Sequence, residues 1–400
     1  MKIILSGGWG YGNLGDDAIL YSSIKLLRDK FPDSTIVVLS YNIPETESII
    51  KEFDNVSITS SFHAVIYGTK HKKFPVGKNF IDEFLHQFSV DNIASIRRSN
   101  NARQTGSFLK NYESFYIEHK ESFDNFREVC KDANVYVMSG GGYLAGWAEM
   151  HISKFCEIDI AKKCNLKTYV LGQTILPSNN NSWAIIEKIL NKSDGTFFRD
   201  AQSLQDANKM KIECYNRVVP DLVLSNCFGD SKKENYIVLI PFTKDLLNNK
   251  KIIIDNIEEI TTKSNTEVYI TVSQHWPLPI KIGLNFYFSL KEKGINARMI
   301  IPYNFKELVN IVASAQMTFS QNLHGLILSY CAHTPVVSLN KNRKFVSFME
   351  MIGQSENLFS PQDITASSLY NCFMRREVFD FGYLDLFRKQ IYEAINKTLK

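Results

Sequence analysis

The chain has 400 residues, of which 44% are hydrophobic and 22% are charged, and its formal net charge at pH 7 is +4. This length predicts two domains, and this composition is typical of a soluble globular protein. The small net charge gives no reason to expect nucleic acid as a partner, and no apolar run approaches the ~20 residues that span a bilayer.

The first predicted elements are a strand over 2–6, a glycine-rich loop over Gly7–Gly15 and a helix over 16–30. In this arrangement backbone N–H groups and a helix N-terminus face a ligand. Part of the loop matches G-x-G-x-x-G as a string, which alone is weak evidence for a dinucleotide. Asp16 and Asp17 at the helix start disfavour a phosphate there. The loop is therefore either a capped tight turn or a polar cradle for sugar hydroxyls.

Strand-like runs then alternate with helical patterns along most of the chain, which predicts two parallel α/β sheets with right-handed crossovers. The further predicted strands are 35–40, 135–139, 167–172, 195–198, 217–219, 236–241, 267–272, 297–301, 317–319 and 335–339. The further predicted helices include 182–192, 202–209, 281–293, 305–314 and 325–332. A polar, turn-rich linker at 228–235 separates the two sets.

Residues 60–130 interrupt the alternation and are predicted to form a mostly helical insertion. Between Ser61 and Lys110 there are eight Lys or Arg residues and three Asp or Glu residues. This basic excess indicates either a solvated insertion or a surface that approaches anionic lipid or a pyrophosphate-linked acceptor.

These elements predict an N-terminal domain over 1–228, which includes the insertion, and a C-terminal domain over 236–361. Residues 362–400 are predicted to be helical and to pack back on the first domain.

Polar residues follow several of the predicted strands, at the edge where open α/β sheets bind ligands. His324 comes between the strand 317–319 and the helix 325–332, and its near-neutral pKa suits general acid–base catalysis. Arg199 follows the strand 195–198. It is either an anion clamp or one member of a salt bridge with Asp200 at the start of the next helix, which Asp200 can cap. Gln274 follows the strand 267–272.

A second glycine loop is predicted at Ser139–Tyr143, also at a strand end. Together with residues 8–17 it would line a sugar site, since Tyr11, Asn13, Asp16 and Tyr143 supply stacking and hydrogen-bonding groups.

The seven cysteines are scattered, without a C-x-x-C pair, as in reduced proteins of the cytoplasm. No signal peptide is visible, and no spacing of His, Asp or Glu indicates a metal site.

The order of several short motifs resembles that of the polysaccharide pyruvyl transferase family. The segments that carry the resemblance are Gly10–Ile19, Ser139–Leu144, Leu171–Ile175 with Pro177, Arg199–Leu204, Pro220–Leu222, Ser320–Gly325, and Lys344 with Phe348. Each motif is short, but together they span roughly residues 1–353 in the order of the family.

The resemblance implies a GT-B-like fold, in which two Rossmann-like domains face a cleft, with the acceptor side in the first domain and the donor side in the second. It implies transfer of pyruvyl from phosphoenolpyruvate, a co-substrate with no further cofactor, to a glycan or lipid-linked glycan of a surface polysaccharide such as a capsule, forming a cyclic ketal. His324 would be catalytic, and the donor-binding residues would be Gln274, Arg199, Asn322, Leu323 and Lys344. The acceptor-binding residues would be Gly10, Tyr11, Gly12, Asn13, Asp16, Gly141, Gly142 and Tyr143. We expect a cytoplasmic protein, with peripheral contact at the inner face of the membrane as an open alternative.

One position departs from the family. Asn322 stands where relatives usually have an arginine that helps to hold the donor, and asparagine lacks its charge and bidentate fork. Two alternatives therefore stay open: a GT-B glycosyltransferase that uses a nucleotide sugar, and a catalytically inactive partner in a polysaccharide-assembly complex.

Overall fold

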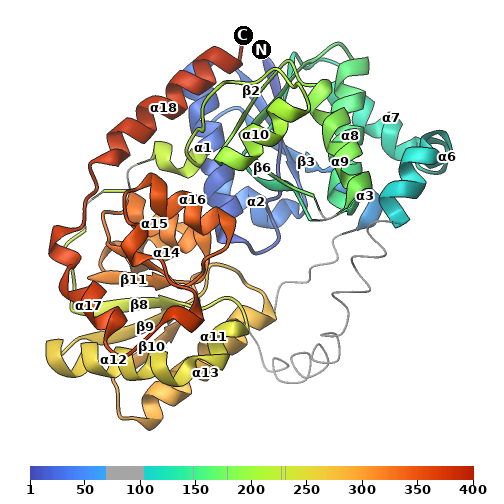
Figure 1. Cartoon of the computed structure of the whole chain (residues 1–400). Helices are drawn as coiled ribbons and strands as arrows, with labels where there is room; N and C mark the ends of the chain where they lie inside the picture. Colours follow the sequence, from blue (N-terminus) through green and yellow to red (C-terminus); the bar gives the residue numbers. More distant parts are fainter. Residues whose placement is uncertain (69–102, 147, 178, 227, 230) are drawn as a thin grey trace. The chain divides into compact units, whose positions relative to one another are not determined.

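The computed structural model describes residues 1–68, 103–146, 148–177, 179–226, 228–229 and 231–400. These residues form two compact units, each with a parallel β-sheet (Figure 1). Unit 1 comprises Met1–Tyr11, Ile19–Ser225 and Lys389–Lys400, and unit 2 comprises Gly12–Ala18 and Asn226–Arg388. The α/β class predicted from the alternating pattern is confirmed.

The sheet of unit 1 has the strand order β3-β2-β1-β4-β6-β5, with β7 on the other side of β6. Its strands are β1 (Lys2–Ser6), β2 (Thr35–Ser40), β3 (Val56–Ser60), β4 (Val135–Met138), β5 (Gly141–Ala145), β6 (Lys167–Leu176) and β7 (Gly195–Phe198). The central strand β1 is almost wholly buried, which explains why it is a continuous apolar run without alternation.

Two predictions for this sheet were wrong. The second glycine loop is not a loop throughout, because Gly141–Ala145 forms β5, which pairs with β6 just beyond β4. Glycines usually weaken a strand, so the sequence pattern favoured a loop there. The predicted strand 217–219 is reduced to a single bridge between Phe198 and Val218.

The helices of unit 1 pack around this sheet, and those on one face share an apolar core rich in phenylalanine and isoleucine. They are α1 (Leu14–Lys30, which begins in unit 2), α2 (Ile43–Ile50), α3 (Phe62–Tyr67), α6 (Tyr112–Glu118), α7 (Lys120–Cys130), α8 (Ala148–Lys163), α9 (Asn180–Asn191), α10 (Ala201–Lys209) and the 3-10 turn η2 (Leu222–Ser225). The described parts of the predicted insertion are largely helical. Most of its basic residues lie outside the described residues, so its proposed contact with lipid stays a prediction.

The sheet of unit 2 has the strand order β10-β9-β8-β11-β12, and all its pairs are parallel. Its strands are β8 (Tyr236–Ile240), β9 (Glu267–Thr271), β10 (Ala297–Ile300), β11 (Met317–Ser320) and β12 (Val336–Ser338). Each of the five strands begins within one residue of the start of a predicted strand, because these short apolar runs are bounded by turn residues.

Helices cover both faces of the unit 2 sheet, with α12 and α13 on one face and α14 to α16 on the other (Figure 1). The helices are α11 (Asp245–Asn248), α12 (Lys250–Ser264), α13 (Pro277–Glu292), α14 (Phe305–Ala313), α15 (Leu323–Cys331), α16 (Arg343–Met351), α17 (Ser368–Met374) and α18 (Tyr383–Thr398), with 3-10 turns η3 (Ser355–Asn357), η4 (Pro361–Asp363) and η5 (Arg376–Val378). The apolar side of α12 supplies isoleucines to the core.

Two segments belong to a different unit from their sequence neighbours. The start of α1, with the residues just before it, clusters with unit 2, and the last residues of α18 cluster with unit 1. In unit 1 the Tyr169 hydroxyl donates to the Lys400 carbonyl at 2.8 Å, and Lys30 Nζ donates to Asn396 Oδ1 at 3.2 Å. The segment 362–388 lies in unit 2, so only the last part of the predicted C-terminal segment lies with the first unit.

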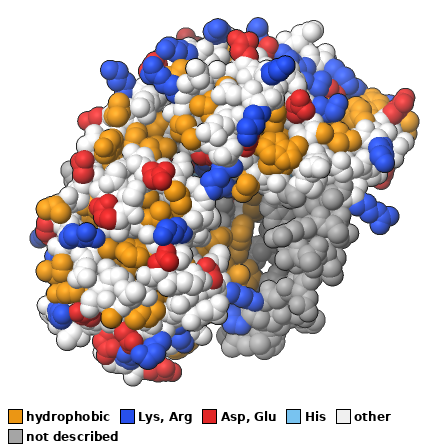
Figure 2. All heavy atoms as spheres, viewed as in Figure 1, with side chains coloured by type: hydrophobic (Ala, Val, Ile, Leu, Met, Phe, Trp, Pro, Cys, Tyr) orange, Lys and Arg blue, Asp and Glu red, His pale blue; other side chains and the backbone are white. Residues whose placement is uncertain are grey.

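The surface carries both signs of charge. On the face shown in Figure 2, Lys and Arg side chains are interspersed with Asp and Glu side chains. Among the described residues, no helix combines the length and the apolar character that crossing a membrane requires.

Candidate functional site

Each sheet has a point at which the connections change direction. In unit 1 the chain leaves β1 for β2 on one side and reaches β4 on the other; in unit 2 it leaves β8 for β9 on one side and reaches β11 on the other. Open α/β sheets bind ligands at the carboxyl ends of the strands beside such a switch point. The carboxyl ends of β1 and β4, and those of β8 and β11, are therefore the two candidate positions.

In unit 2, short polar side chains hold the turn from β11 into α15. The Asn322 N–H donates to Ser320 Oγ at 3.0 Å, and the Gly325 N–H donates to Asn322 Oδ1 at 3.2 Å. Asn322 is thus the N-cap of α15, and it is 6% exposed. Leu323, the first residue of the helix, is half-buried. Capping accounts for an asparagine at 322, since its short side chain reaches back to the helix N-terminus.

Gln321 ties this turn to the loop after β8. Its Oε1 accepts from the N–H groups of Phe242 at 3.0 Å and Thr243 at 2.7 Å, and its Nε2 donates to Asp245 Oδ1 at 2.9 Å. The side chain is wholly buried. Gln321 was not among the predicted site residues, because its partners lie about 80 residues earlier and no local pattern marks it. Both strand ends at this switch point are therefore fixed by hydrogen bonds.

A segment from the start of the chain completes this region of unit 2. The Leu14 N–H donates to the Ser273 carbonyl at 3.0 Å, and the His275 N–H donates to the Gly12 carbonyl at 2.8 Å. Gly12 has a φ of +79°, which favours glycine. The segment therefore pairs with the loop after β9 as a short strand would.

This pairing corrects the prediction that the whole glycine loop lies with the first domain. Asn13 forms an antiparallel bridge with Gln274, so Gly12, Asn13 and Asp16 lie in unit 2 with residues predicted to bind the donor. Of the predicted acceptor-binding residues in this loop, Gly10 and Tyr11 lie in unit 1. A sequence pattern reports local conformation and does not show which sheet a loop joins.

The helix α1 begins two residues earlier than predicted, at Leu14. Asn13 Oδ1 accepts from the Gly15 N–H at 3.2 Å, and Asn13 Nδ2 donates to Asp16 Oδ2 at 2.6 Å. Asn13, rather than Asp16, therefore satisfies the helix start. Asp16 is 6% exposed and already accepts a hydrogen bond within the protein.

His324 lies in the first turn of α15, and its ring packs directly against Gly15. A Cβ added to Gly15 would lie 2.0 Å from His324 Nδ1, so only glycine leaves room for the ring. The side chain is half-buried. The contact joins two motifs, the glycine loop and the histidine turn, that are about 300 residues apart in sequence.

Gln274 brings an unusual polar atom to this region. The residue is 6% exposed, and among the described residues its Oε1 has no hydrogen-bond partner. A buried acceptor without a partner costs free energy that a donor from a ligand would recover. A hydroxyl can supply that donor, whereas the oxygens of a carboxylate or an ionised phosphate are acceptors.

Three lysines of unit 2 follow its strands. Lys344 lies in the first turn of α16, where its N–H donates to Asn342 Oδ1 at 3.1 Å. Burial and the nearby charge of Lys244 lower the pKa of Lys281, which lies in the second turn of α13. Lys244 and Lys281 were not among the predicted site residues.

In unit 1, the glycine loop packs against aromatic rings. A Cβ added to Gly8 would lie 2.3 Å from the Tyr143 ring, and one added to Gly141, whose φ is +139°, would lie 2.7 Å from it. Tyr143 is 5% exposed, and its N–H donates to Gln173 Oε1 at 3.1 Å. Tyr11 packs on the Tyr41 ring, with 5.2 Å between the centroids.

The remaining glycines of the predicted acceptor site also lie in unit 1. Gly10 has a φ of +85°, and a Cβ there would lie 2.6 Å from Thr46 Oγ1. Gly142 lies in β5 and is half-buried. The residues predicted to bind the acceptor are therefore divided between the two units.

Arg199 is held in a buried ion pair within unit 1. Its NH1 donates to Asp221 Oδ2 at 2.5 Å, and its Nε donates to Thr174 Oγ1 at 2.9 Å. The side chains of Arg199 and Asp221 are 7% and 5% exposed. Asp200 caps α10 by accepting from the Ser203 N–H at 2.9 Å, as predicted, whereas the ion-pair partner of Arg199 is Asp221 and not the adjacent Asp200. Arg199 thus has a counterion within the fold, and its role as an anion clamp stays a prediction.

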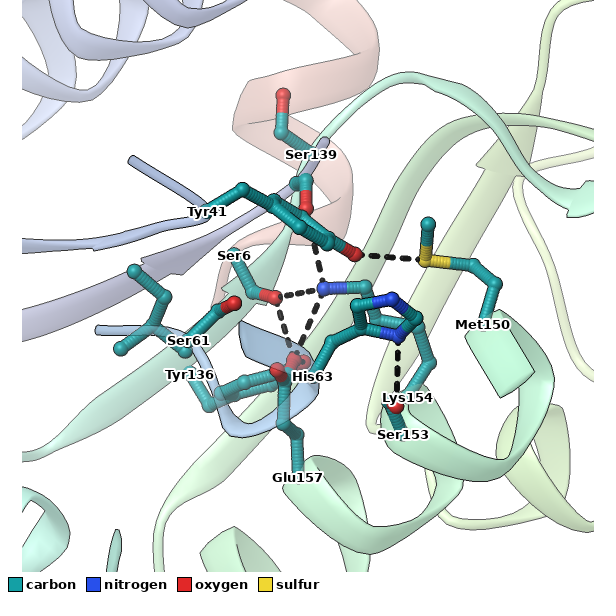
Figure 3. Close-up of polar contacts among 12 residues, drawn as sticks. Ser6, Tyr41, Ser61, His63, Tyr136, Ser139, Met150, Ser153, Lys154 and Glu157 are labelled. Carbon is teal, nitrogen blue, oxygen red and sulfur yellow. Dashed lines mark hydrogen bonds and ion pairs between the residues drawn. The ribbon is translucent and has the colours of Figure 1, made fainter. Parts of the chain in front are cut away.

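A second buried ion pair lies below the glycine loop of unit 1. Lys154 Nζ and Glu157 Oε2 of α8 are 3.1 Å apart, and both side chains are wholly buried (Figure 3). Neither residue of this pair was among the predicted site residues. A Lys and an acid three residues apart on a helix usually form a solvated surface pair, so the spacing carried no signal of burial.

The arrangement in unit 2 offers an imidazole, a helix N-terminus, lysine ammonium groups and an amide oxygen that has no partner in the described part of the chain. These groups can exchange a proton, hold an anion and bind a hydroxyl. In unit 1 the same kind of position offers aromatic rings and glycine backbone, which suit the flat faces of a sugar.

Comparison with known proteins agrees with this picture. The model of the family described as polysaccharide pyruvyl transferase matches residues 13–342. A comparison with curated proteins found no match.

Similar solved structures include the UDP-GlcNAc 2-epimerase from Neisseria meningitidis bound to UDP-GlcNAc, at 12% identity and a TM-score of 0.58, covering 100% of both chains. The UDP-GlcNAc 2-epimerase from Methanocaldococcus jannaschii matches at 13% identity and a TM-score of 0.55, covering 96% of this chain and 93% of its own. TcCGT1 in complex with UDP matches at 11% identity and a TM-score of 0.52, covering 100% of this chain and 94% of its own. At such low identity these likenesses establish the GT-B fold alone. The family match, which extends over most of the chain and includes His324 and Gly15, shows that the chain belongs to the polysaccharide pyruvyl transferase family.

Proposed function

We propose that this enzyme transfers pyruvyl from phosphoenolpyruvate to two hydroxyls of one sugar in a surface-polysaccharide precursor and forms a cyclic ketal. One observation carries the proposal: in a chain of this family, His324 lies at the switch point of unit 2 and packs against Gly15 of the first motif. A titratable imidazole at the carboxyl edge of a parallel sheet suits a reaction that depends on proton transfer.

The reaction balances in four steps. C3 of phosphoenolpyruvate takes up a proton, and C2 becomes cation-like. One sugar hydroxyl attacks C2 and loses its proton, inorganic phosphate then leaves, and the second hydroxyl attacks C2 and loses its proton to close the ring. We assign the proton exchange with donor or acceptor hydroxyl to His324.

Charged groups would hold the donor. Lys344 is our predicted contact for its carboxylate or phosphate, and Lys244 and Lys281 are further candidates because they follow β8 and β9, the strands at and beside the switch point. Arg199 stays a predicted contact whose charge Asp221 shares. Gln274 Oε1 is better suited to a sugar hydroxyl than to an anion, since it can only accept a hydrogen bond.

The acceptor is proposed to be a glycan or lipid-linked glycan, held by the glycine backbone and tyrosines of the predicted acceptor site. We place the reaction in the cytoplasm, at the inner face of the membrane where the acceptor carries a lipid.

The direct test is mass spectrometry of a candidate glycan incubated with the enzyme and phosphoenolpyruvate. Ketal formation adds the mass of pyruvic acid less one water and releases one inorganic phosphate per ketal. Phosphate release without a change in the glycan would indicate hydrolysis and would contradict the proposal. The His324→Ala variant serves as the matched blank.

A glycosyltransferase that uses a nucleotide sugar is the second candidate, and the neutral Asn322 favours it, because the site lacks the arginine that relatives place near a small dianion. Thermal-shift titration separates the two: stabilisation by phosphoenolpyruvate supports pyruvyl transfer, and stabilisation by a nucleoside diphosphate supports glycosyl transfer. A catalytically inactive assembly partner would be stabilised by neither ligand.

A further inference from the structure

The buried ion pair of α8 lies at the switch point of unit 1, between the carboxyl end of β1 and the strand β4. We call Ser6, Tyr136, Lys154 and Glu157 the Lys154 cluster (Figure 3). Ser6 is the last residue of β1, and Tyr136 lies in β4. The position is that of a ligand site in an open α/β sheet, yet the proposed mechanism uses none of these residues.

Every donor of the Lys154 ammonium has a partner. Nζ donates to Ser6 Oγ at 2.6 Å, to the Gly7 carbonyl at 3.1 Å and to Glu157 Oε2 at 3.1 Å. The same Oε2 accepts from Ser6 Oγ at 2.5 Å and from the Tyr136 hydroxyl at 2.8 Å. The network therefore has one direction of donation, from the ammonium through Ser6 to the carboxylate. Its outer end is the first carbonyl of the glycine loop.

The fold itself does not require a charge at this position. Three apolar residues near the pair on α8, Ile152, Phe155 and Ile158, belong to the core of unit 1. Apolar residues of similar volume usually match or exceed the stability of a buried ion pair. Burial lowers the pKa of the Lys154 ammonium, and the Glu157 carboxylate partly counters this effect. Stability alone therefore does not explain why a charged pair is buried at this position.

The ammonium also faces the rings beside the loop. Lys154 Nζ lies 5.9 Å from the centroid of the Tyr143 ring and 6.0 Å from that of Tyr41. Gly8, the next residue after the anchored carbonyl, is in such close contact with the Tyr143 ring that a Cβ would lie 2.3 Å from it. The position of Gly7 therefore determines where the Gly8 backbone and the Tyr143 ring can lie.

We propose that Lys154 is a positioning residue that fixes the Gly7–Gly8 backbone and the Tyr143 ring for the sugar acceptor. The proposal rests on the function proposed above. Recognition of a sugar needs backbone and ring held to a fraction of an ångström, and a hydrogen bond from a buried ammonium is stronger than one from a neutral group. Lys154 itself need not touch the sugar.

The test uses the double variant Lys154→Met/Glu157→Gln of the full chain. It removes both charges and keeps the volumes, and the new amide at 157 still accepts from Ser6 and Tyr136. The bond to the Gly7 carbonyl is lost without replacement by the new methionine. We expect the KM for the glycan to rise about tenfold, the size of one lost charge-assisted hydrogen bond, with the thermal midpoint and the KM for phosphoenolpyruvate close to wild type.

The control is Asp159→Asn on the same helix. Asp159 accepts from Tyr112 at 2.8 Å and pairs with Lys163 at 2.8 Å and Lys192 at 2.9 Å. Loss of its charge should lower the thermal midpoint and leave the KM for the glycan unchanged. If the double variant behaves in the same way, the Lys154 cluster is structural and the proposal is wrong.

Hydrogen exchange gives a readout that does not depend on the reaction. In the double variant the amides of Gly8 and Trp9 should exchange faster, while those of β6 keep their rates. Unchanged exchange at Gly8 and Trp9 overturns the positioning role even where no ketal is formed. Absence of ketal formation by the wild-type enzyme instead overturns the proposed function.

Discussion

The two switch points have the same strand topology, but different side chains lie at their strand ends. The order β3-β2-β1-β4 in unit 1 corresponds to β10-β9-β8-β11 in unit 2. Unit 1 places a wholly buried ion pair and tyrosine rings at the strand ends, whereas unit 2 places a capping asparagine, a buried glutamine and a half-buried imidazole there. In unit 1 the buried Lys154 ammonium donates a hydrogen bond to the backbone of the glycine loop. In unit 2 the imidazole of His324 lies in the first turn of α15 itself.

The difference shows how one topology serves two tasks. A buried ion pair is sensitive to the loss of one partner but exchanges no proton with a ligand that it does not touch. A half-buried imidazole in a turn held by neutral hydrogen bonds contributes less to stability and is available to a ligand. We therefore expect mutations at the unit 1 switch point to affect mainly stability or acceptor affinity, and mutations at the unit 2 switch point to affect mainly turnover.

The largest effect is expected for Lys154→Met alone. It leaves the Glu157 carboxylate wholly buried without its counterion, which costs about 3–5 kcal/mol of the free energy of unfolding. Urea unfolding followed by circular dichroism measures this loss. The surface pair Lys162–Asp194, at 2.7 Å and with side chains 32% and 26% exposed, provides the control, because Lys162→Met should cost about 1 kcal/mol or less. Equal losses in the two variants would show that the burial of Lys154 has no energetic consequence.

The next largest effect concerns His324. The His324→Ala variant should slow turnover about a hundredfold or more, the usual range for a general acid–base, with the thermal midpoint little changed. Steady-state release of inorganic phosphate measures it. His333 of the same unit has a φ of 51°, a conformation that asparagine accepts, so His333→Asn is the matched control and should keep wild-type turnover. Turnover near wild type in His324→Ala would remove this imidazole from the mechanism.

Gly15→Ala tests the contact between the two motifs without touching the imidazole chemically. Alanine favours a helix over glycine by about 1 kcal/mol, so α1 itself should tolerate the change. The added Cβ would lie 2.0 Å from His324 Nδ1, so the ring must move. We expect kcat to fall about a hundredfold, as for a catalytic group displaced by an ångström. Wild-type kcat with an unchanged fold would show that the ring has other productive positions.

The pH dependence of stability is expected to come in part from unit 1. His151 of α8 is wholly buried, and burial lowers its pKa to about 4 from 6.5. Between these values the unfolded chain binds a proton that the folded chain does not, so stability falls as pH falls. The loss from this group at pH 5 relative to pH 8 is about 2 kcal/mol. In His151→Leu this part of the acid slope should vanish, as measured by thermal unfolding from pH 8 to pH 5; an unchanged slope would assign it to other groups.

Much of the fold could be predicted from the sequence, because most strands are marked by patterns of neighbouring residues. The strands of unit 2 are short apolar runs between turn residues, and patterns of this kind depend on a few neighbouring residues. β5 was missed because Gly141 and Gly142 resemble a loop, and only pairing with β6 makes them a strand. The helix α8 was missed because its residues are buried almost throughout, polar ones included, so that no apolar stripe marks it.

The site residues could be predicted from the sequence only where they belong to a recognisable motif. His324 and the first glycine turn could be found from their order along the chain. The contact of His324 with Gly15, the assignment of Gly12 and Asn13 to unit 2, and the Lys154–Glu157 pair depend on tertiary packing, which no local pattern records. Asn322 could be recognised as a departure from the family, but its role as a helix cap needed the structure.

The smallest expected effect concerns that cap, and it separates capping from charge. Asn322→Ala should lower the free energy of unfolding by about 1 kcal/mol, because the Gly325 N–H loses its acceptor. Asn322→Asp keeps an equally good cap and adds a negative charge at the N-terminus of α15, which stabilises the helix. If the donor anion binds at this turn, Asn322→Asp should raise the KM for phosphoenolpyruvate several-fold while the protein stays at least as stable as wild type. Asn322→Ala should show the reverse, with a lower stability and a nearly unchanged KM. Equal KM values in all three proteins would mean that the donor does not approach Asn322, and the search for its anion site would move to Lys244 and Lys281.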